Sequence, residues 1–382
     1  MKKIIIVAGA RPNFMKIAPI VRALERSGLF EYRIVHTGQH YDENMSRVFF
    51  DELGIPSPHC NLQIGSGSQA VQTAAIMVRF EEVCLQERPD LVVVVGDVNS
   101  TIACGLVAKK LGIRLAHVEA GLRSYDRTMP EEINRIATDA IADCFFTTEP
   151  DGTENLLREG HDPGAVHFVG HVMIDTLLYQ RDRLGPETVS RAALSLKRRI
   201  VGTFACMTLH RPANVDSAAA LGALLDAVAV LAGIAPVLFP CHPRTKKNIE
   251  AFGLMPRFTR DDGVSPVGPG IRLLDPLSYN DFLYLWKDAA LVLTDSGGLQ
   301  EETTALKIPC VTLRDTTERP VTQEIGSNVV VGGDREKILH HGRRALAGTW
   351  KESAIPALWD GKAGERIVAI LDGLMNGRTT PV

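Results

Sequence analysis

The sequence lacks paired cysteines, an excess of charge and a long apolar run. Its seven cysteines are scattered, odd in number and never form a C-x-x-C pair, a pattern that argues against a zinc site or a disulfide framework. Most lie beside apolar residues, so we expect buried thiols in a reducing cytoplasm. Lys and Arg total 42 against 45 Asp and Glu, a net charge of −3, so we expect neither nucleic acid nor a membrane as partner. No apolar run reaches the length of a membrane-spanning helix.

The length of 382 residues favours two domains, because one hydrophobic core rarely keeps growing to this size. Short β-branched runs alternate with segments of helical period, which is typical of α/β proteins with parallel sheets covered by helices. A connecting stretch at residues 172–194 separates two series of strands. The first series is expected at residues 4–7, 33–36, 91–95, 114–118, 145–148 and 167–169, and the second at residues 201–207, 236–239, 271–274, 291–294, 310–313 and 328–331.

Two helices follow directly on strands and begin with proline, a residue suited to the first turn. After Pro12, an apolar stripe at helical spacing predicts the buried face of a helix, and a second stripe follows Pro130. The first stripe comprises Phe14, Ile17, Ile20, Val21 and Leu24, and the second comprises Ile133, Ile136, Ala137, Ala140 and Ile141.

Arg11 and Lys16 follow the first expected strand. The turn contains neither the G-x-G-x-x-G dinucleotide fingerprint nor a Walker loop. At the carboxyl end of a parallel strand, an Arg and a Lys one turn apart would face a ligand in the crevice where such sheets bind small molecules. The alternative is that both are solvated surface cations.

Three further strand-to-helix connections carry carboxylates. Asp97 follows the strand at residues 91–95, Glu119 follows the strand at residues 114–118, and Glu131 opens the next helix. We expect these groups at one edge of the sheet. Glu131 and Glu132 also fit ordinary capping at a helix start. Glu119 has no such explanation, because no first-turn helix pattern follows it.

In the second half, Ser296, Gly297 and Gly298 lie between an apolar strand and a helix, a pattern that suits a diphosphate at a helix amino terminus. A tight turn before a capped helix is the alternative. Glu301 or Glu302 could accept hydrogen bonds from ribose hydroxyls.

His210 and His242 each end a strand, although isolated histidines are more often structural. Arg314 and Arg319 add positive charge that suits an anion with several oxygens, and residues 277–282 could hold a flat base or belong to the core.

Seven motifs in order, G-A-R-P-x-x-x-K, G-D-V-N-S-T, H-V-E-A-G-L-R-S, P-E-E-I-N-R, L-H-R, D-S-G-G-L-Q-E-E and T-T-E-R-P, resemble the non-hydrolysing UDP-N-acetylglucosamine 2-epimerases over nearly the whole chain. The resemblance implies the GT-B architecture, with two Rossmann-like domains and the active site in the cleft between them. We place the first domain at residues 1–178, the second at residues 179–362, and a last helix that returns to the first domain at residues 363–382, with Ile367, Ile370 and Leu371 on its apolar face.

The resemblance also implies roles for single residues. The sugar end would comprise Lys16, Asp97, Glu119 and Glu131, and His210 would assist catalysis. The substrate-binding set would comprise Arg11, Lys16, Asp97, Glu119, His210, His242, Leu277, Phe282, Ser296, Gly297, Gly298, Glu302 and Arg319. Leu277 departs from the glutamine of the enterobacterial members, so a base contact there would come from the backbone.

The implied reaction is reversible epimerisation at carbon 2 of UDP-N-acetylglucosamine, through elimination of UDP to 2-acetamidoglucal and re-addition. No cofactor or metal is expected, and no D-x-D pair is present to hold one on the diphosphate. The family is usually homodimeric. After Gln39 and His40 this chain continues Tyr41-Asp42-Glu43, where substrate-activated members of the family have Arg-Glu. The difference puts allosteric activation by the substrate in doubt. The same run resembles the corresponding segment of enzymes that act on UDP-2,3-diacetamido-glucuronic acid. The motifs also leave room for a hydrolysing epimerase, a GT-B glycosyltransferase or a catalytically silent sugar-nucleotide sensor.

Overall fold

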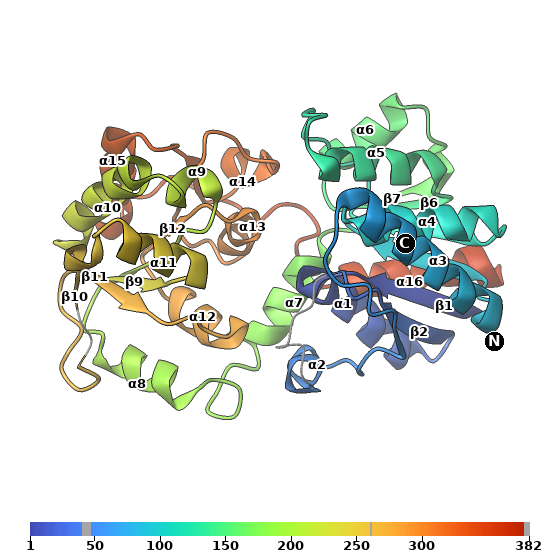
Figure 1. Cartoon of the computed structure of the whole chain (residues 1–382), viewed down its shortest axis with the longest axis horizontal. Helices are drawn as coiled ribbons and strands as arrows, with labels where there is room; N and C mark the ends of the chain where they lie inside the picture. Colours follow the sequence, from blue (N-terminus) through green and yellow to red (C-terminus); the bar gives the residue numbers. More distant parts are fainter. Residues whose placement is uncertain (40–46, 260–261, 378–382) are drawn as a thin grey trace. The chain divides into compact units, whose positions relative to one another are not determined.

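The architecture comes from a computed structural model that describes residues 1–39, 47–259 and 262–377 (Figure 1). It divides into two units. The first comprises Met1–Tyr179 and the chain from Ala357 onward, and the second comprises Gln180–Pro356. The run Tyr41-Asp42-Glu43 lies outside the described residues.

The first unit is built on a parallel sheet with seven strands among its described residues, in the order β3-β2-β1-β4-β5-β6-β7. Two neighbouring central strands, at residues 3–8 and 91–95, consist mostly of valine and isoleucine, and Ile5 and Val93 are fully buried. Continuous apolar strands of this kind suit a parallel sheet that helices cover on both faces. The strands are β1 (Lys3–Ala8), β2 (Glu31–His36), β3 (Cys60–Asn61), β4 (Leu91–Val95), β5 (Arg114–Val118), β6 (Cys144–Thr147) and β7 (Val166–Phe168).

The helices of the first unit connect these strands. They are α1 (Arg11–Ser27), α2 (Arg47–Leu53), α3 (Gln69–Glu87), α4 (Asn99–Lys110), α5 (Pro130–Ile141), α6 (Pro150–Arg158), the 3₁₀ turn η1 (Pro163–Ala165), α7 (Val172–Arg181), which runs across the division into the second unit, and the late helix α16 (Ala363–Asn376). All five residues of the stripe after Pro12 are buried, as predicted. Helix α16 lies beside α1, although more than 330 residues separate them (Figure 1).

The second unit repeats the plan with seven parallel strands in its described part, in the order β10-β11-β9-β8-β12-β13-β14. The strands are β8 (Ala205–Thr208), β9 (Val237–Pro240), β10 (Phe258–Thr259), β11 (Ile271–Leu274), β12 (Leu291–Thr294), β13 (Cys310–Thr312) and β14 (Asn328–Val330). The helices are α8 (Arg191–Arg199), α9 (Pro212–Val215), α10 (Ala218–Ala232), α11 (Pro243–Ala251), η2 (Met255–Arg257), α12 (Tyr279–Trp286), α13 (Gly297–Ala305), α14 (Val321–Glu324) and α15 (Arg335–Leu346).

The α/β class with two parallel sheets is confirmed, and each of the twelve expected strands overlaps a strand of the structure. One boundary is wrong: the strand expected at residues 201–207 begins only at Ala205, and Val201 is 75% exposed. Six of the seven cysteines are buried, as predicted. Within the described residues, no helix is both long and apolar enough to cross a membrane.

The apolar stripe expected on α5 is also wrong. Ile133 is 48% exposed, whereas Glu132, Arg135 and Asp139 are buried. The helix therefore buries a polar face, which is possible because these side chains form ion pairs with one another and with their neighbours.

Each sheet has one position where the strand order reverses. In the first unit it lies between β1 and β4, and in the second unit between β8 and β12. The connections leaving two such neighbouring strands run to opposite sides, which opens a crevice at the carboxyl ends of the strands. Ligands of doubly wound sheets bind in this crevice, so we expect a site at the carboxyl ends of the strands next to each reversal.

Candidate active site

The turn after β1 brings the start of α1 close to the end of β4. Asn13 accepts hydrogen bonds from the backbone N–H groups of Gly9 and Ala10, at 3.1 and 3.0 Å. A Cβ atom on Gly9 would lie 2.2 Å from Oγ of Ser100, so only glycine fits. Arg11 and Lys16 are therefore presented from the first turns of α1. The guanidinium of Arg11 lies over the ring of Phe49, 5.0 Å from its centre.

Glu119 and Lys16 form a direct ion pair at this edge of the sheet. Oε2 of Glu119 lies 2.5 Å from Nζ of Lys16, and both side chains are largely buried. Glu119 follows β5 with a φ of 69°, a left-handed conformation that is uncommon for a residue with a side chain. Its backbone N–H donates to the carbonyl of Phe146 at 2.9 Å. The strained residue is thus held in place by the neighbouring strand, as is typical of functional positions.

Asp97 is paired with Arg135 of α5, with 2.5 Å between Oδ2 and Nη2. Arg135 also forms an ion pair with Glu132. Burial raises the pKa of Glu132, but hydrogen bonds from Ser124 and the charge of Arg135 outweigh this effect and keep the pKa below its usual value. Glu132 is therefore a structural anion that anchors Arg135. Arg135 was not predicted as a site residue, although it is the last residue of the motif P-E-E-I-N-R.

Asp97 and Glu131 line one cavity of about 250 Å³. Glu131 is exposed at the start of α5, so its carboxylate is accessible. The rest of the lining is mostly amide and hydroxyl groups, which suit a hydroxylated ligand such as a sugar. The other lining residues are Gln39, Ser66, Gly67, Gln69, Gln72, Val98, Asn99, Pro130 and Asn134. Among them, Asn134 donates a hydrogen bond to the carbonyl of Asp97 at 3.0 Å.

In the second unit, His210 follows β8 and is oriented by Asp295, which follows β12. Nδ1 of His210 lies 2.8 Å from Oδ1 of Asp295, and Asp295 also accepts the backbone N–H groups of His210 and Arg211. Burial raises the pKa of Asp295, but the hydrogen bond and charge of His210 outweigh this and lower it. The ionised carboxylate thus fixes the ring and directs Nε2 away from itself. Asp295 opens the motif D-S-G-G-L-Q-E-E, yet its orienting role was not predicted.

Ser296, Gly297 and Gly298 form the amino terminus of α13, next to Asp295. Ser296 is the N-cap residue, and its Oγ accepts the N–H of Leu299 at 3.5 Å. The first N–H groups of a helix have no partner within the helix. A Cβ atom on Gly298 would meet nothing within 4 Å, and one on Gly297 would lie 3.9 Å from Nη1 of Arg314. The helix terminus is therefore open to an anion, with a guanidinium close by.

The two glutamates of α13 have different partners. Glu301 forms an ion pair with Arg319, so Arg319 is held at this helix. Glu302 accepts a hydrogen bond from Oη of Tyr279 at 2.8 Å. Burial raises the pKa of Glu302 to about 7, although the hydrogen bond from Tyr279 acts in the opposite direction. The carboxyl can therefore exchange a proton near neutral pH.

The remaining expected site residues of the second unit lie at the starts of α12 and α11. Leu277 precedes Ser278, the N-cap of α12, and Phe282 lies in its first two turns; both are half-buried. His242 is the N-cap of α11, where Nδ1 accepts the N–H of Arg244 at 3.3 Å. His242 thus caps this helix, and its ring is exposed.

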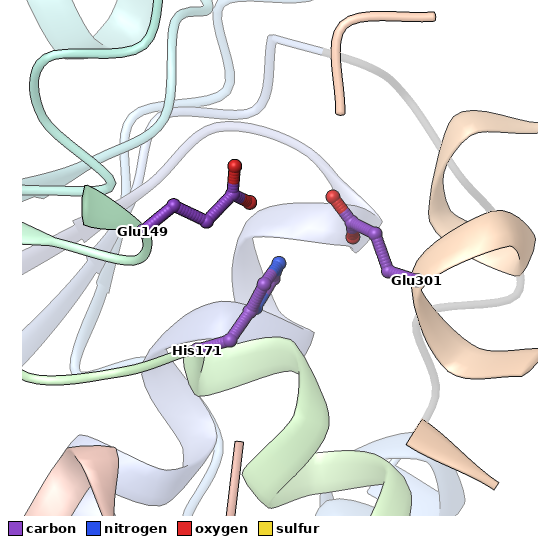
Figure 2. A group of neighbouring side chains, drawn as sticks. All are labelled: Glu149, His171 and Glu301. Carbon is purple, nitrogen blue, oxygen red and sulfur yellow. The ribbon is translucent and has the colours of Figure 1, made fainter. Parts of the chain in front are cut away.

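One more acid and imidazole pair lies in the first unit, outside the motifs. Glu149 follows β6, His171 precedes α7, and ligand atoms of the two side chains lie within 4.8 Å of each other (Figure 2). Both residues are buried. Figure 2 also draws Glu301, the partner of Arg319 in the second unit. No sequence signal distinguished Glu149 or His171.

Comparisons with known proteins identify the family of this chain. Residues 22–372 match the family described as UDP-N-acetylglucosamine 2-epimerase. A UDP-N-acetylglucosamine 2-epimerase of Methanocaldococcus jannaschii is 42% identical over 97% of this chain and 98% of its own length. A UDP-2,3-diacetamido-2,3-dideoxy-D-glucuronate 2-epimerase of Pseudomonas aeruginosa is 37% identical over 97% of this chain and 99% of its own.

The same fold occurs in a crystal structure of the Methanocaldococcus jannaschii UDP-GlcNAc 2-epimerase in complex with UDP-GlcNAc and UDP. The TM-score is 0.81, with 42% identity over 97% of this chain and 99% of that one. The similarity thus extends over nearly the whole length of both chains. The chain belongs to the UDP-N-acetylglucosamine 2-epimerase family.

Proposed function

We propose that the protein interconverts UDP-N-acetylglucosamine and UDP-N-acetylmannosamine by eliminating UDP and adding it back after proton exchange at carbon 2. The observation that carries this proposal is the placement of Asp97 and Glu119 after adjacent strands, each beside a cation, with Glu131 on the same cavity as Asp97. A binding site for a neutral sugar has no need of three such carboxylates.

The chemistry requires bond cleavage before proton removal. The hydrogen on carbon 2 is not acidic, so a carboxylate cannot remove it directly. As the bond from carbon 1 to the phosphate oxygen breaks, its electron pair leaves with UDP and positive charge grows on the ring. A carboxylate then takes the proton from carbon 2, and a double bond forms between carbons 1 and 2, giving 2-acetamidoglucal. Protonation of carbon 2 from the opposite face and return of UDP give the epimer.

The second unit contains the groups that stabilise a departing diphosphate. We assign this role to His210, the turn from Ser296 to Gly298, and Arg319, with Arg11 from the first unit. The ionised Asp295 supports it, because it holds Nδ1 of His210 and leaves Nε2 free; in the protonated ring, Nε2 donates to a phosphate oxygen. Fixed donors aimed at developing negative charge are typically the largest contribution to catalysis of this kind.

The first unit contains the groups for proton transfer. Asp97, Glu119 and Glu131 share the acid and base roles, and two faces of carbon 2 need at least two of them. Lys16 keeps a positive charge beside Glu119, and Arg135 does so beside Asp97. Each cation restrains its carboxylate in one orientation.

A second candidate substrate is UDP-2,3-diacetamido-glucuronic acid. It is favoured by the 37% identity to the Pseudomonas aeruginosa enzyme of that name and by the Tyr41-Asp42-Glu43 run. The chemistry at carbons 1 and 2 would be the same, so the two candidates differ only in what surrounds carbons 3 and 5 of the sugar.

Proton NMR in deuterated water tests the reaction. With UDP-N-acetylglucosamine, deuterium should enter carbon 2 of both epimers while the nucleotide sugar stays intact, and activity should survive exhaustive treatment with EDTA. Free N-acetylmannosamine would instead indicate a hydrolysing epimerase, and dependence on an added sugar acceptor would indicate a glycosyltransferase. If the diacetamido-uronic acid nucleotide alone exchanges, the second substrate is correct. Absence of exchange with both would overturn the epimerase proposal.

We further propose that the enzyme works as a homodimer in the cytoplasm, as its resemblance to the family implies. Light scattering would then give twice the chain mass of 41.6 kDa.

A further inference from the structure

A fully buried histidine lies directly behind the carboxylates of the first unit. His117, in β5, and Asp139, in α5, are both 0% exposed, and Nδ1 of His117 lies 2.6 Å from Oδ1 of Asp139. The other ring nitrogen, Nε2, lies 2.8 Å from the carbonyl oxygen of Gly96. Gly96 is the residue before Asp97, so the ring connects a core carboxylate to the turn that presents a proposed catalytic group.

The partners determine which ring atoms carry protons. The Gly96 carbonyl can only accept, so Nε2 of His117 must donate. Oδ2 of Asp139 accepts from Nη1 of Arg123 at 2.7 Å and from the N–H of Gly121 at 3.1 Å. Burial raises the pKa of Asp139, but the charge and hydrogen bond of His117 and those of Arg123 outweigh this and lower it. The carboxylate is therefore ionised, and Nδ1 of His117 donates to it as well.

We infer that His117 positions the Gly96–Asp97 turn by donating a hydrogen bond from each ring nitrogen, and that it takes no part in proton transfer. A ring with a donor on each nitrogen is the charged form. The charges around it are balanced: Arg123 pairs with Asp139 on one side and with Glu159 on the other. Neither ring nitrogen is available to a substrate, because both are engaged and the side chain is inaccessible.

The hydrogen bond from His117 holds the Gly96 peptide, which we call the clamp at Gly96, at a place where a small movement would affect several site residues. Its N–H donates to the carbonyl of Val118 at 3.0 Å, while its carbonyl accepts from His117. A Cβ atom at Gly96 would lie 2.9 Å from Nζ of Lys16 and 4.0 Å from Oε2 of Glu119, so this peptide passes next to the ion pair of Lys16 and Glu119. A small rotation of the peptide would displace Asp97 and crowd that pair at once. Misplacing reacting groups by about 1 Å can cost a hundredfold in rate.

The protonation state can be tested without any assay of turnover. In long-range ¹H–¹⁵N spectra of the wild-type protein at neutral pH, both ring nitrogens of His117 should show the chemical shift of nitrogens that carry a hydrogen. The signal is assigned by its loss in the His117→Gln variant. A signal from a ring nitrogen of His117 without a hydrogen would overturn the inference.

Two matched variants test the positioning role, which rests on the proposed epimerase reaction. The side-chain amide of glutamine reaches the place of Nε2, so His117→Gln keeps the donor to Gly96 and loses the one to Asp139. Asparagine reaches the place of Nδ1, so His117→Asn does the opposite. We expect kcat to fall at least about tenfold in His117→Asn and only a few-fold in His117→Gln, with KM close to wild type in both.

Comparing the two variants distinguishes an effect on the position of Asp97 from an effect on stability alone, because each variant loses one of the two hydrogen bonds of the ring. Similar losses of thermal stability with unequal kcat support the clamp at Gly96. Equal kcat in the two variants, or a lower kcat in His117→Gln, would overturn it. If His117→Asn does not fold, the spectra of the wild-type protein still decide whether both ring nitrogens of His117 donate. If the wild-type protein shows no epimerase activity, the proposed function fails while the NMR result stands.

Discussion

Asp295 and Glu302 are both buried carboxylates near the start of α13, yet their pKa values move in opposite directions. The ring of His210, the backbone N–H of Arg211 and the amide of Asn214 donate to Asp295 and lower its pKa despite burial. Glu302 receives one phenol hydrogen, from Tyr279, and this does not offset the desolvation that raises its pKa to about 7. The number and kind of donors, and not burial alone, therefore decide which carboxyl stays charged.

Glu302 should make the protein less stable as the pH rises. Its pKa is about 4.5 in the unfolded chain and about 7 in the folded one, so the folded state binds the proton more tightly. Its contribution is fully present below pH 4.5 and is lost as the pH rises to about 7, by up to about 3 kcal/mol. Glu302→Gln keeps an acceptor for Tyr279 and cannot ionise. Denaturant unfolding between pH 4.5 and 8 should therefore show the variant gaining stability relative to wild type as the pH rises.

A matched control for this experiment is Glu365→Gln, which alters a half-exposed glutamate on α16. It should leave the pH dependence of unfolding unchanged. Parallel curves for Glu302→Gln and wild type would mean that Glu302 stays ionised in the fold and that its raised pKa is wrong.

At the scale of single residues, the sequence motifs indicated the candidate site residues but not the side chains that pair with them. Asp97, Glu119 and His210 follow strands, a position that the sequence reveals. Their partners Arg135 and Asp295 lie within the same motifs, but only the folded chain shows what they contact. Hydrophobic periodicity does not reveal a buried polar residue. The cost of burying such a residue is offset by one specific partner, which can lie anywhere in the sequence.

Among the elements, α16 is joined to the start of the chain by a close backbone contact. The N–H of Gly364, in the first turn of α16, donates to Oδ2 of Asp175 in α7 at 2.8 Å. A Cβ atom on Gly364 would lie 2.6 Å from the backbone carbonyl of Pro19 in α1. Helix α16 can therefore approach α1 this closely only because glycine occupies that position.

Gly364→Ala should destabilise the first unit by about 1–3 kcal/mol, the usual cost of overpacking a tight contact. The backbone of α1 cannot move aside as a flexible side chain would. Thermal unfolding measures the effect, and Gly333→Ala is the control, because a Cβ atom there meets nothing within 4 Å. Equal stability of the two variants would show that α16 can shift on α1 without loss.

The elements that the sequence predicted best are those whose buried face is apolar, because apolar residues at regular spacing are visible in the sequence. The apolar stripe of α1 is buried throughout, since its helix covers a valine-rich and isoleucine-rich sheet. The prediction of a buried apolar stripe on α5 was wrong, because the buried face of this helix consists of side chains in ion pairs, which hydrophobic periodicity does not detect. Strands β3 and β10 were missed because each has two residues and lies at the edge of its sheet.

For the whole molecule, the recurrence of the strand and helix pattern predicted two parallel sheets, and the structure has them. The two switch points carry different chemistry. The first has carboxylates with their cations, and the second has an oriented histidine and an open helix amino terminus. This division follows from the residues after each strand, because the backbone plan is the same in both units.

The two sets of residues should separate in their effects on binding and on turnover. Asp97→Asn, Glu119→Gln and Glu131→Gln keep the size of the side chain but remove the charge that proton transfer needs, so kcat should fall about a hundredfold or more. The affinity for UDP should barely change, since UDP lacks the sugar on which these groups act. Initial rates combined with titration calorimetry against UDP measure both quantities.

Variants of the diphosphate contacts should behave differently. His210→Ala removes a donor that serves both the bound nucleotide and the leaving group, so UDP affinity and rate should fall together. Glu365→Gln, far in sequence from both sets, should change neither. If Glu119→Gln abolished UDP binding while the protein stayed folded, Glu119 would belong to the nucleotide contacts. The ion pair of Glu119 with Lys16 would then orient Lys16 toward a phosphate rather than prepare a base for carbon 2.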